Sequence, residues 1–208
     1  MHLDNIDPKT TAVLVIDMQA DFLEPGSGVF VESGYKFLPK MVPFLDKCRE
    51  KGCTIIYSKN VIRPDQRNIG KAGEFCPPIK EGRMCVDGAP GAEICPVIAP
   101  KENDIVIKKQ KYSFFYGTDL LNTLTTIGIK TVILTGVCTD CCVFSTARDA
   151  GFYNFDVGFL SDLTGTVGYD DIGFGSFTAE EVQACFITTI AVTTGDVMTS
   201  EDFLSRLI

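Results

Sequence analysis

Three residues that could act together in catalysis each lie at or shortly after an apolar stretch of the sequence. Asp17 lies near the end of TAVLVIDM, Lys109 follows DIVIK, and Cys142 comes shortly after TVILTG. If these stretches are parallel strands, their carboxyl ends meet at one edge of a sheet, where ligands bind in such folds. A thiol, a carboxylate and an amine supply a nucleophile, a proton carrier and a fixed cation. The sequence therefore predicts nucleophilic catalysis by cysteine.

The histidine content excludes several other hydrolytic mechanisms. The chain has a single histidine, His2. Ser-His-Asp hydrolases, Cys-His proteases and HExxH zinc enzymes all require histidine in the site. The pair Cys138 and Cys141 has the spacing of a redox or zinc motif. Zinc needs about four ligands and no second pair has suitable spacing, so we expect no metal site.

Each of the three residues also has an ordinary structural explanation. An isolated aspartate after a strand commonly caps a turn, a lysine in KKQK is commonly solvated, and a helical cysteine commonly packs in a core. A carboxylate at the end of a buried strand nevertheless needs a partner, and Lys109 is the candidate for Asp17. We expect Thr139 to be the N-cap of a helix. Cys142 would then lie in its first turn, where free N–H groups lower a thiol pKa.

The elements around these residues alternate between strand-like and helical patterns. Beyond the three apolar stretches, we predict strands at 53–58, 154–161 and 196–199, and helices at 36–51, 118–127, 139–150, 178–189 and 200–207, the last capped by Ser200. Alternation of this kind implies βαβ units. We therefore predict an α/β fold, a three-layer α-β-α sandwich with a mostly parallel, Rossmann-like six-stranded sheet, in a single domain over residues 1–208.

Two segments do not fit this alternation. Residues 59–101 are rich in glycine, proline and charge and are too long for an ordinary connection, so we expect a lid or substrate loop. Residues 165–175 are rich in glycine without the spacing of a phosphate-binding loop, so we expect a mobile loop.

Composition limits the partners and the compartment. The 208 residues are 45% hydrophobic and 22% charged, with a net charge of −8 and no basic run. We therefore expect no nucleic-acid partner and no membrane partner. The nine cysteines are an odd number, and the N-terminal residues do not resemble a signal peptide. We expect a cytoplasmic protein with mostly free thiols.

Three motifs carry a family resemblance. TAVLVIDMQADF, VIKKQKYSFFYGTDL and LTGVCTDCCVFSTARDAGF resemble segments of the isochorismatase-like cysteine hydrolases, and GAPGAEI and GDVMTSEDF are similar to two further segments. The resemblance covers nearly the whole chain. It implies a catalytic triad of Asp17, Lys109 and Cys142, with the backbone N–H groups of Cys138 and Cys142 forming the oxyanion hole. It also implies a cis peptide between Val137 and Cys138.

The spacing within the family motifs selects the individual triad residues. Lys109 is chosen over Lys108 and Lys111 because the family pattern places Tyr-Ser after two intervening residues. Cys142 is chosen over Cys141 because the pattern is Thr-Asp-x-Cys-Val.

The resemblance also narrows the reaction. The namesake vinyl-ether hydrolases lack the nucleophilic cysteine that this chain has, and the nicotinamidases carry histidine metal ligands where this chain reads YSKNVIRPDQRN. The resemblance therefore implies a cofactor-free amidohydrolase that releases ammonia from a small carbamoyl, ureido or other primary amide through a thioester-type intermediate. Enzymes for N-carbamoylsarcosine, ureidoacrylate, biuret and maleamate are similar. A homo-oligomer, dimer or tetramer, is expected for this family.

Substrate contacts are predicted from residue type alone. Phe22 could form a pocket wall, Gln19 could hydrogen-bond the substrate, and Arg63, Arg67 or Arg83 could bind a substrate carboxylate. Two alternatives to an enzyme remain at this stage. One is a catalytically silent binding protein on the same scaffold, and the other is a binding protein regulated by thiol redox chemistry through its clustered cysteines.

Overall fold

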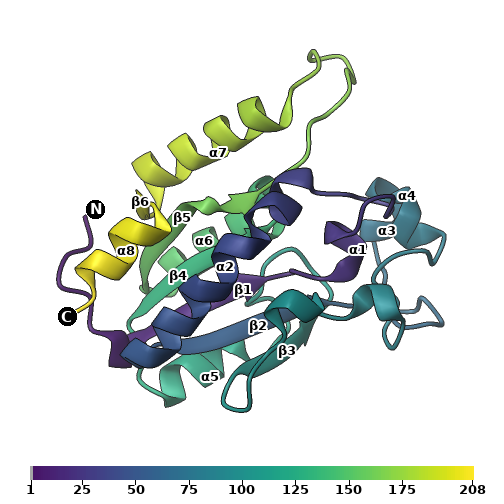
Figure 1. Ribbon diagram of the computed structural model, residues 1–208. Helices are drawn as coiled ribbons and strands as arrows, with labels where there is room; N and C mark the ends of the chain where they lie inside the picture. The colour runs from purple at the N-terminus through teal and green to yellow at the C-terminus, as the bar shows by residue number, and fades with distance from the viewer. Residues whose placement is uncertain (1) are drawn as a thin grey trace.

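The computed structural model describes residues 2–208 and confirms the predicted α/β fold. Six strands form one parallel sheet in the order β3-β2-β1-β4-β5-β6, with helices on both faces (Figure 1). The strands are β1 (Thr11–Ile16), β2 (Thr54–Asn60), β3 (Ile105–Lys109), β4 (Thr131–Val137), β5 (Asp156–Gly165) and β6 (Asp196–Met198). The chain reverses its direction of winding between β1 and β4, which is where open α/β sheets bind ligands.

Burial of the strands explains why their sequences are so apolar. Every residue of β1 and β4 is buried, because these strands are central and covered on both faces. The edge strand β3 instead alternates between partly buried and exposed residues until Lys109, which is fully buried. A lysine that is buried at the end of an edge strand is unusual and indicates a specific partner.

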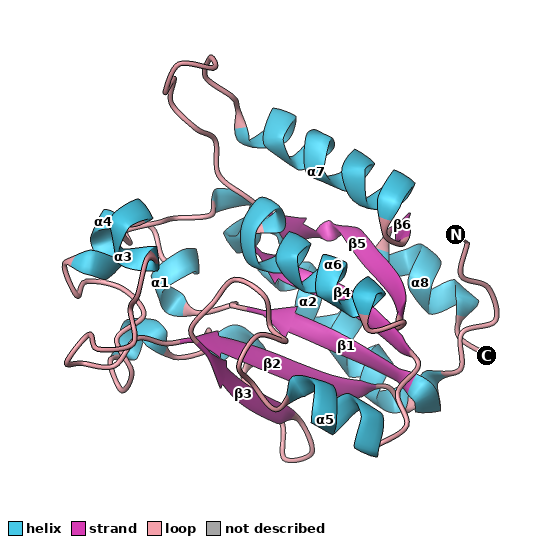
Figure 2. Cartoon of the chain, turned by 180° about the vertical axis from the view of Figure 1, so that it is seen from behind, coloured by secondary structure: helices cyan, strands magenta, loops and turns pink. Residues whose placement is uncertain are grey.

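The helices divide between the two faces of the sheet. They are α1 (Ala20–Leu23), α2 (Glu32–Lys51), α3 (Ala72–Phe75), α4 (Pro77–Lys80), α5 (Leu120–Thr126), α6 (Phe144–Phe152), α7 (Ala179–Thr193) and α8 (Ser200–Arg206). The long helix α2 and the last helix α8 cover one face, and α5, α6 and α7 cover the other (Figure 2). Within residues 2–208, no helix is both long enough and apolar enough to span a membrane.

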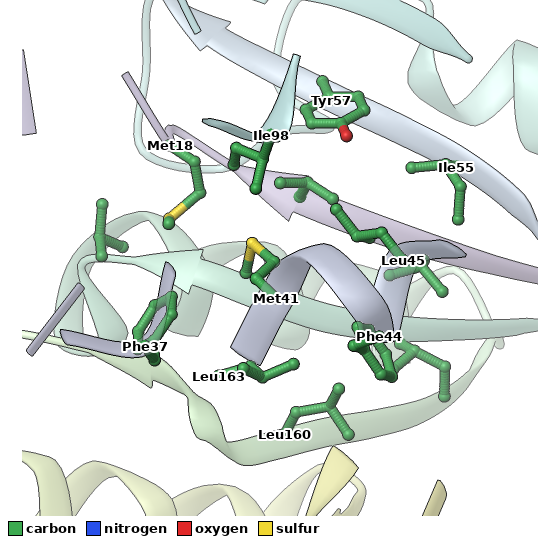
Figure 3. Packing of buried hydrophobic residues seen from close by; sticks show 14 of the residues in the cluster. Met18, Phe37, Met41, Phe44, Leu45, Ile55, Tyr57, Ile98, Leu160 and Leu163 are labelled. Atoms are coloured by element: carbon green, nitrogen blue, oxygen red, sulfur yellow. The ribbon is translucent and has the colours of Figure 1, made fainter. Parts of the chain in front are cut away.

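The larger core lies between α2 and the sheet. Met41, Phe44 and Leu45 of α2 pack toward Ile55 of β2 and Leu160 of β5 (Figure 3). These α2 positions recur at helical spacing, which is the amphipathic pattern that predicts the helix. The helix begins at Glu32 rather than at the predicted Lys36, and its two prolines, Pro39 and Pro43, lie inside it.

Other element boundaries also differ from the sequence prediction. Strand β5 runs over 156–165 rather than 154–161, so it takes in the first glycine of the predicted glycine-rich loop. Helix α8 is capped by Thr199 rather than Ser200. The Thr199 side chain accepts a hydrogen bond from the Asp202 amide and the Asp202 carboxylate accepts one from the Thr199 amide, which is a reciprocal capping box.

Two irregular segments lie near the carboxyl ends of the strands. After β2, residues 61–101 form the short helices α3 and α4 and several turns, and a β-bridge joins Ile62 to Val86. After β5, residues 166–178 form a loop that a bridge between Tyr169 and Phe177 closes on itself. This loop extends beyond the body of the molecule, next to the start of α7 (Figures 1 and 2).

Gly136 permits the close contact between β1 and β4 at this edge. It pairs with Ile16 and has a φ of +108°, and a Cβ atom there would lie 2.0 Å from the Ile16 carbonyl oxygen. We expect Gly136→Ala to lower the free energy of unfolding by more than about 3 kcal/mol, measured by urea denaturation. Gly128→Ala is the control, because Gly128 also has a positive φ but a Cβ atom there meets nothing within 4 Å. Equal losses in the two variants would contradict the steric explanation.

Candidate active site

Asp17, the first residue of the candidate site, lies at the carboxyl end of β1. The strand ends at Ile16. Asp17, the next residue, has a left-handed backbone conformation with a φ of +50°, so the chain changes direction at this edge of the sheet. The Ser58 hydroxyl of the neighbouring strand accepts a hydrogen bond from the Asp17 amide at 3.0 Å and donates one to Asp17 Oδ1 at 2.6 Å. Ser58 therefore fixes both the backbone and the carboxylate of Asp17.

Lys109 lies between the carboxylate and the thiol. Its Nζ atom is 2.7 Å from Asp17 Oδ2, 3.3 Å from Cys142 Sγ and 2.9 Å from the Lys111 carbonyl oxygen. The ammonium thus has three acceptors, which a fully buried lysine requires. Burial opposes its charge, but Asp17 and Cys142 outweigh burial and hold the pKa of Lys109 above its usual value. The structure therefore brings the three predicted triad residues together.

The second oxygen of Asp17 is the one available for proton transfer. Asp17 Oδ1 receives the hydrogen bond from Ser58, whereas Oδ2 faces the Lys109 ammonium and receives no well-aligned hydrogen bond from the rest of residues 2–208. Asp17 is buried, with 1% of its surface exposed. An oxygen with free acceptor capacity beside a thiol can act as a general base.

Cys142 lies in a π-helical turn, Thr139–Val143, that leads from β4 into α6. The predicted N-cap, Thr139, is wrong: Cys138 occupies that position, and the buried Thr139 hydroxyl finds no hydrogen-bond partner among residues 2–208. The expected lowering of the thiol pKa is also wrong. Burial raises the pKa of Cys142, and the neighbouring Lys109 opposes this without reversing it. Burial of this residue therefore favours the neutral thiol over the thiolate.

The backbone before the nucleophile is arranged around Cys138. The Val137–Cys138 peptide bond is cis. The Cys138 carbonyl accepts hydrogen bonds from the amides of Cys141 at 3.2 Å and Val143 at 3.1 Å, on either side of the Cys142 amide. Amides at the start of a helix can stabilise a negative charge.

Asp140 connects the nucleophile turn to the loop after β5. The hydroxyls of Thr166 and Tyr169 both donate to its carboxylate, and Cys141 Sγ lies 4.0 Å from the Tyr169 hydroxyl. Burial, followed by the hydrogen bond to Asp140, raises the pKa of Tyr169, so this phenol stays protonated and remains a donor. The 166–178 loop is thereby attached to the turn that carries Cys142.

Gln19 and Phe22 lie within the fold next to the site. Gln19 Nε2 donates to the carbonyl oxygens of Asn60 at 3.0 Å and Ala92 at 2.8 Å, and Oε1 accepts from the Asn60 amide at 2.7 Å. A bond from Gln19 to a substrate would therefore have to use the remaining lone pair of Oε1. Phe22 is buried in the core cluster on the α2 side of the sheet.

The candidate arginines are paired with nearby carboxylates and are exposed. Arg63 bonds Asp65 through two nitrogens, and Arg83 bonds Glu81 at 2.5 Å. Arg67 lies 4.0 Å from Asp65 with 85% of its side chain exposed. The structure does not bring these guanidinium groups to the triad, and binding of a substrate carboxylate by them stays a prediction.

Ser58 is the site residue that the sequence analysis missed. The sequence offers only one indication of its role, which is a hydroxyl side chain within the otherwise apolar stretch that forms β2. We expect Ser58→Ala to lower kcat of the amide hydrolysis proposed below by about 10- to 100-fold, because one hydrogen bond to a charged group contributes about 1.5–3 kcal/mol. KM should change much less, and Ser58→Thr should recover most of kcat by restoring the hydroxyl. An unchanged kcat in the alanine variant would exclude this positioning role.

Comparison with known proteins identifies the family. The model of the isochorismatase domain matches residues 11–202. A ureidoacrylate amidohydrolase, RutB of Caulobacter vibrioides, is 30% identical over 182 residues, covering 79% of this chain and 81% of RutB. A cysteine hydrolase structure from Pseudomonas syringae pv. phaseolicola is 31% identical, with a TM-score of 0.94 and coverage of 99% of this chain and 97% of that one. N-carbamoylsarcosine amidase from Thermoplasma acidophilum is 25% identical, with a TM-score of 0.72 over 92% of this chain and 97% of that one. The chain therefore belongs to the isochorismatase family and is an amidohydrolase.

Proposed function

We propose that this enzyme hydrolyses a small carbamoyl, ureido or other primary amide with Cys142 as nucleophile, and that it releases ammonia. The observation that carries the proposal is the position of Lys109 Nζ, which contacts both Asp17 Oδ2 and Cys142 Sγ in a buried site. The substrate class is supported by the relatives, since RutB is an amidohydrolase for ureidoacrylate and the Thermoplasma enzyme is an amidase for N-carbamoylsarcosine.

The first step forms a covalent intermediate. Cys142 Sγ attacks the amide carbonyl carbon while the thiol proton moves to Asp17 Oδ2. The Lys109 ammonium stabilises the developing thiolate at 3.3 Å and holds the carboxylate at 2.7 Å. Because burial disfavours the thiolate of Cys142, removal of the thiol proton accompanies the attack. This makes Asp17 essential for nucleophile activation.

The second step expels ammonia. The negative charge on the carbonyl oxygen is stabilised by the backbone N–H groups of Cys138 and Cys142, the proposed oxyanion hole. Asp17 returns its proton to the departing nitrogen, the C–N bond breaks, and a thioester or thiocarbamate remains on Cys142. Water then attacks this intermediate, with Asp17 as the base, and the thiol is regenerated.

We propose that the reaction needs no cofactor. The sequence after β2, where the nicotinamidases carry metal-binding histidines, contains none in this chain. We also propose that residues 59–101 border the substrate site as a lid or substrate loop within a single domain, since this segment holds Gln19 through Asn60 and Ala92. We also propose a cytoplasmic location, since the nine cysteines are an odd number and the reducing cytoplasm keeps thiols free.

The test is ammonia release by the unchanged enzyme and by Cys142→Ala. The substrates are N-carbamoyl amino acids, ureidoacrylate, biuret, maleamate and nicotinamide, each with and without a chelator. We expect turnover of one ureide or carbamoyl compound that resists the chelator and disappears in the variant. Activity lost to the chelator would overturn the cofactor-free mechanism. Activity retained by Cys142→Ala would overturn the cysteine mechanism, and no turnover of any compound would favour a silent binding protein.

We further propose a homo-oligomer, a dimer or tetramer, that associates through α7. This helix has only two buried residues, Val182 and Ile190, and the sequence from 182 to 195 has no charged side chain. Figures 1 and 2 show it at the outer edge of the molecule. A second copy presenting the same apolar helix would cover it by two-fold symmetry.

Light scattering after gel filtration tests this association. We expect a mass that is two or four times that of the 22.7 kDa chain. Val192→Lys on α7 should reduce it, whereas Phe75→Lys on α3 should not, although Phe75 and Val192 are similarly exposed at 77% and 75%. A monomer for the unchanged chain, or equal effects of the two substitutions, would contradict the proposal.

A further inference from the structure

Two cysteines are brought together where α2 ends and β2 approaches. The helix stops at Gly52, which has a φ of +96°, and the Gly52 amide donates to the Arg49 carbonyl at 3.0 Å. The Cys53 amide donates to the Cys48 carbonyl at 2.9 Å. This pair of hydrogen bonds defines a Schellman motif, in which the third residue from the helix end usually makes an apolar contact with the second residue beyond it. Here both of those positions are cysteine.

Both cysteine side chains are buried on the α2 side of the sheet. Cys48 has 0% and Cys53 has 7% of its surface exposed, and both belong to the same core cluster. The two thiols also perturb each other: Cys53 and burial raise the pKa of Cys48, whereas Cys48 lowers the pKa of Cys53. The backbone bond from the Cys53 amide to the Cys48 carbonyl keeps the two residues adjacent across the turn, as a disulfide between them would require.

We propose that Cys48 and Cys53 form a redox-active dithiol that a peroxide converts to a disulfide. The Cys53 sulfur attacks one oxygen of hydrogen peroxide, the O–O bond breaks, and Cys53 becomes a sulfenic acid while water leaves. The Cys48 sulfur then attacks the Cys53 sulfur, the S–S bond forms, and a second water leaves with the Cys48 proton. Two thiols are oxidised and one peroxide is reduced to two waters. Cys53 is the first to react, since it is the more exposed of the two.

This dithiol is separate from the active site. Cys53 directly precedes the first residue of β2, whereas the triad lies at the carboxyl ends of the strands. Oxidation of the dithiol should therefore leave the catalytic geometry intact. The disulfide would instead link the last turn of α2 covalently to the residue that precedes β2, within the larger core. It would be a reversible structural modification, distinct from any oxidation of Cys142.

Peptide mapping tests the proposal directly. The full-length protein is treated with hydrogen peroxide in one arm and refolded with oxidised glutathione in another, where burial does not limit access. Remaining thiols are alkylated under denaturing conditions and the protein is digested with trypsin, which cuts after Lys47, Arg49, Lys51 and Lys59. We expect the peptide with Cys48 linked to the peptide with Cys53, lighter than their sum by two hydrogen atoms, and a loss of two alkylatable thiols at this site per chain.

Variants separate this site from other oxidation. Cys53→Ser should abolish the link, and Cys76→Ser, which removes a partly exposed cysteine between α3 and α4, should leave it unchanged. Reducing the peroxide-treated protein with dithiothreitol should return both peptides to the free form. Finding Cys48 and Cys53 alkylated and unlinked in both arms would overturn the proposal. A link that persists in Cys53→Ser would overturn it as well.

Discussion

Asp17→Asn should lower kcat for ammonia release by about 10²- to 10⁴-fold, the usual contribution of a general acid and base. The amide keeps the shape of the carboxylate and still faces Lys109, but it cannot accept the thiol proton. Because burial raises the pKa of Cys142 and no other carboxylate contacts its sulfur within the described chain, removal of this base leaves a neutral thiol. Single-turnover kinetics with the substrate identified by the panel measures the acylation rate.

The matched control for this substitution is Asp87→Asn. Asp87 also pairs with a lysine, Lys108, through two contacts of 2.8 Å. That pair is exposed, although Lys108 directly precedes Lys109 in the sequence. We expect kcat to stay within about two-fold of the unchanged enzyme, as for a surface ion pair. Comparable losses in the two variants would contradict the assignment of Asp17 as the base.

Lys109→Met should lower the free energy of unfolding by about 3–5 kcal/mol, because it leaves the Asp17 charge buried without its partner. Methionine has a similar length, so the packing volume is nearly kept. The measurement is urea denaturation at pH 7, with Lys108→Met as control. The exposed Lys108 pair should contribute no more than about 1 kcal/mol. The Lys109 variant should also lose turnover, since its thiolate has no neighbouring cation.

The double variant Asp17→Asn, Lys109→Met distinguishes an ion pair from simple packing. Replacing both buried charges together is often close to neutral for stability. We therefore expect the double variant to be more stable than Lys109→Met by at least about 2 kcal/mol, although it is inactive. If the two losses simply add, the stability cost arises from packing rather than from an unpaired charge.

The sequence predicted those parts of the fold that follow from continuous burial. TAVLVIDM and TVILTG form the central strands β1 and β4, and each is buried on both faces as its composition indicates. The sequence predicted less accurately the ends of helices, which depend on local hydrogen bonds. Glu32 starts α2 without a side-chain cap, and Thr199 rather than Ser200 caps α8, because the cap depends on backbone geometry that residue type does not determine.

The candidate site also has parts that the sequence predicts and parts that it does not. The convergence of Asp17, Lys109 and Cys142 follows from strand order and could be anticipated from the motifs. Ser58 could not, because its role depends on the register that sets β2 beside β1. The contact of Tyr169 with Asp140 was also unpredictable, since it joins a loop to a turn 29 residues away in sequence. The raised pKa of Cys142 follows from burial, which only the folded chain reveals.

The order of strands also limits which side chains position 58 can accept. Strand β3 is not the neighbour of β1, because β2 lies between them, and adjacent strands are about 4.8 Å apart. Lys109 must therefore extend across the carboxyl end of β2 to reach Asp17, and only a long, unbranched cation can cover that span. Ser58, two residues before the end of β2, has to leave clearance for this crossing. A library randomised at codon 58 and selected for turnover should thus return serine and threonine, which keep the hydroxyl, and exclude leucine, phenylalanine and arginine. Side-chain volume at position 58, in addition to its hydroxyl, would then restrict the evolution of this active site.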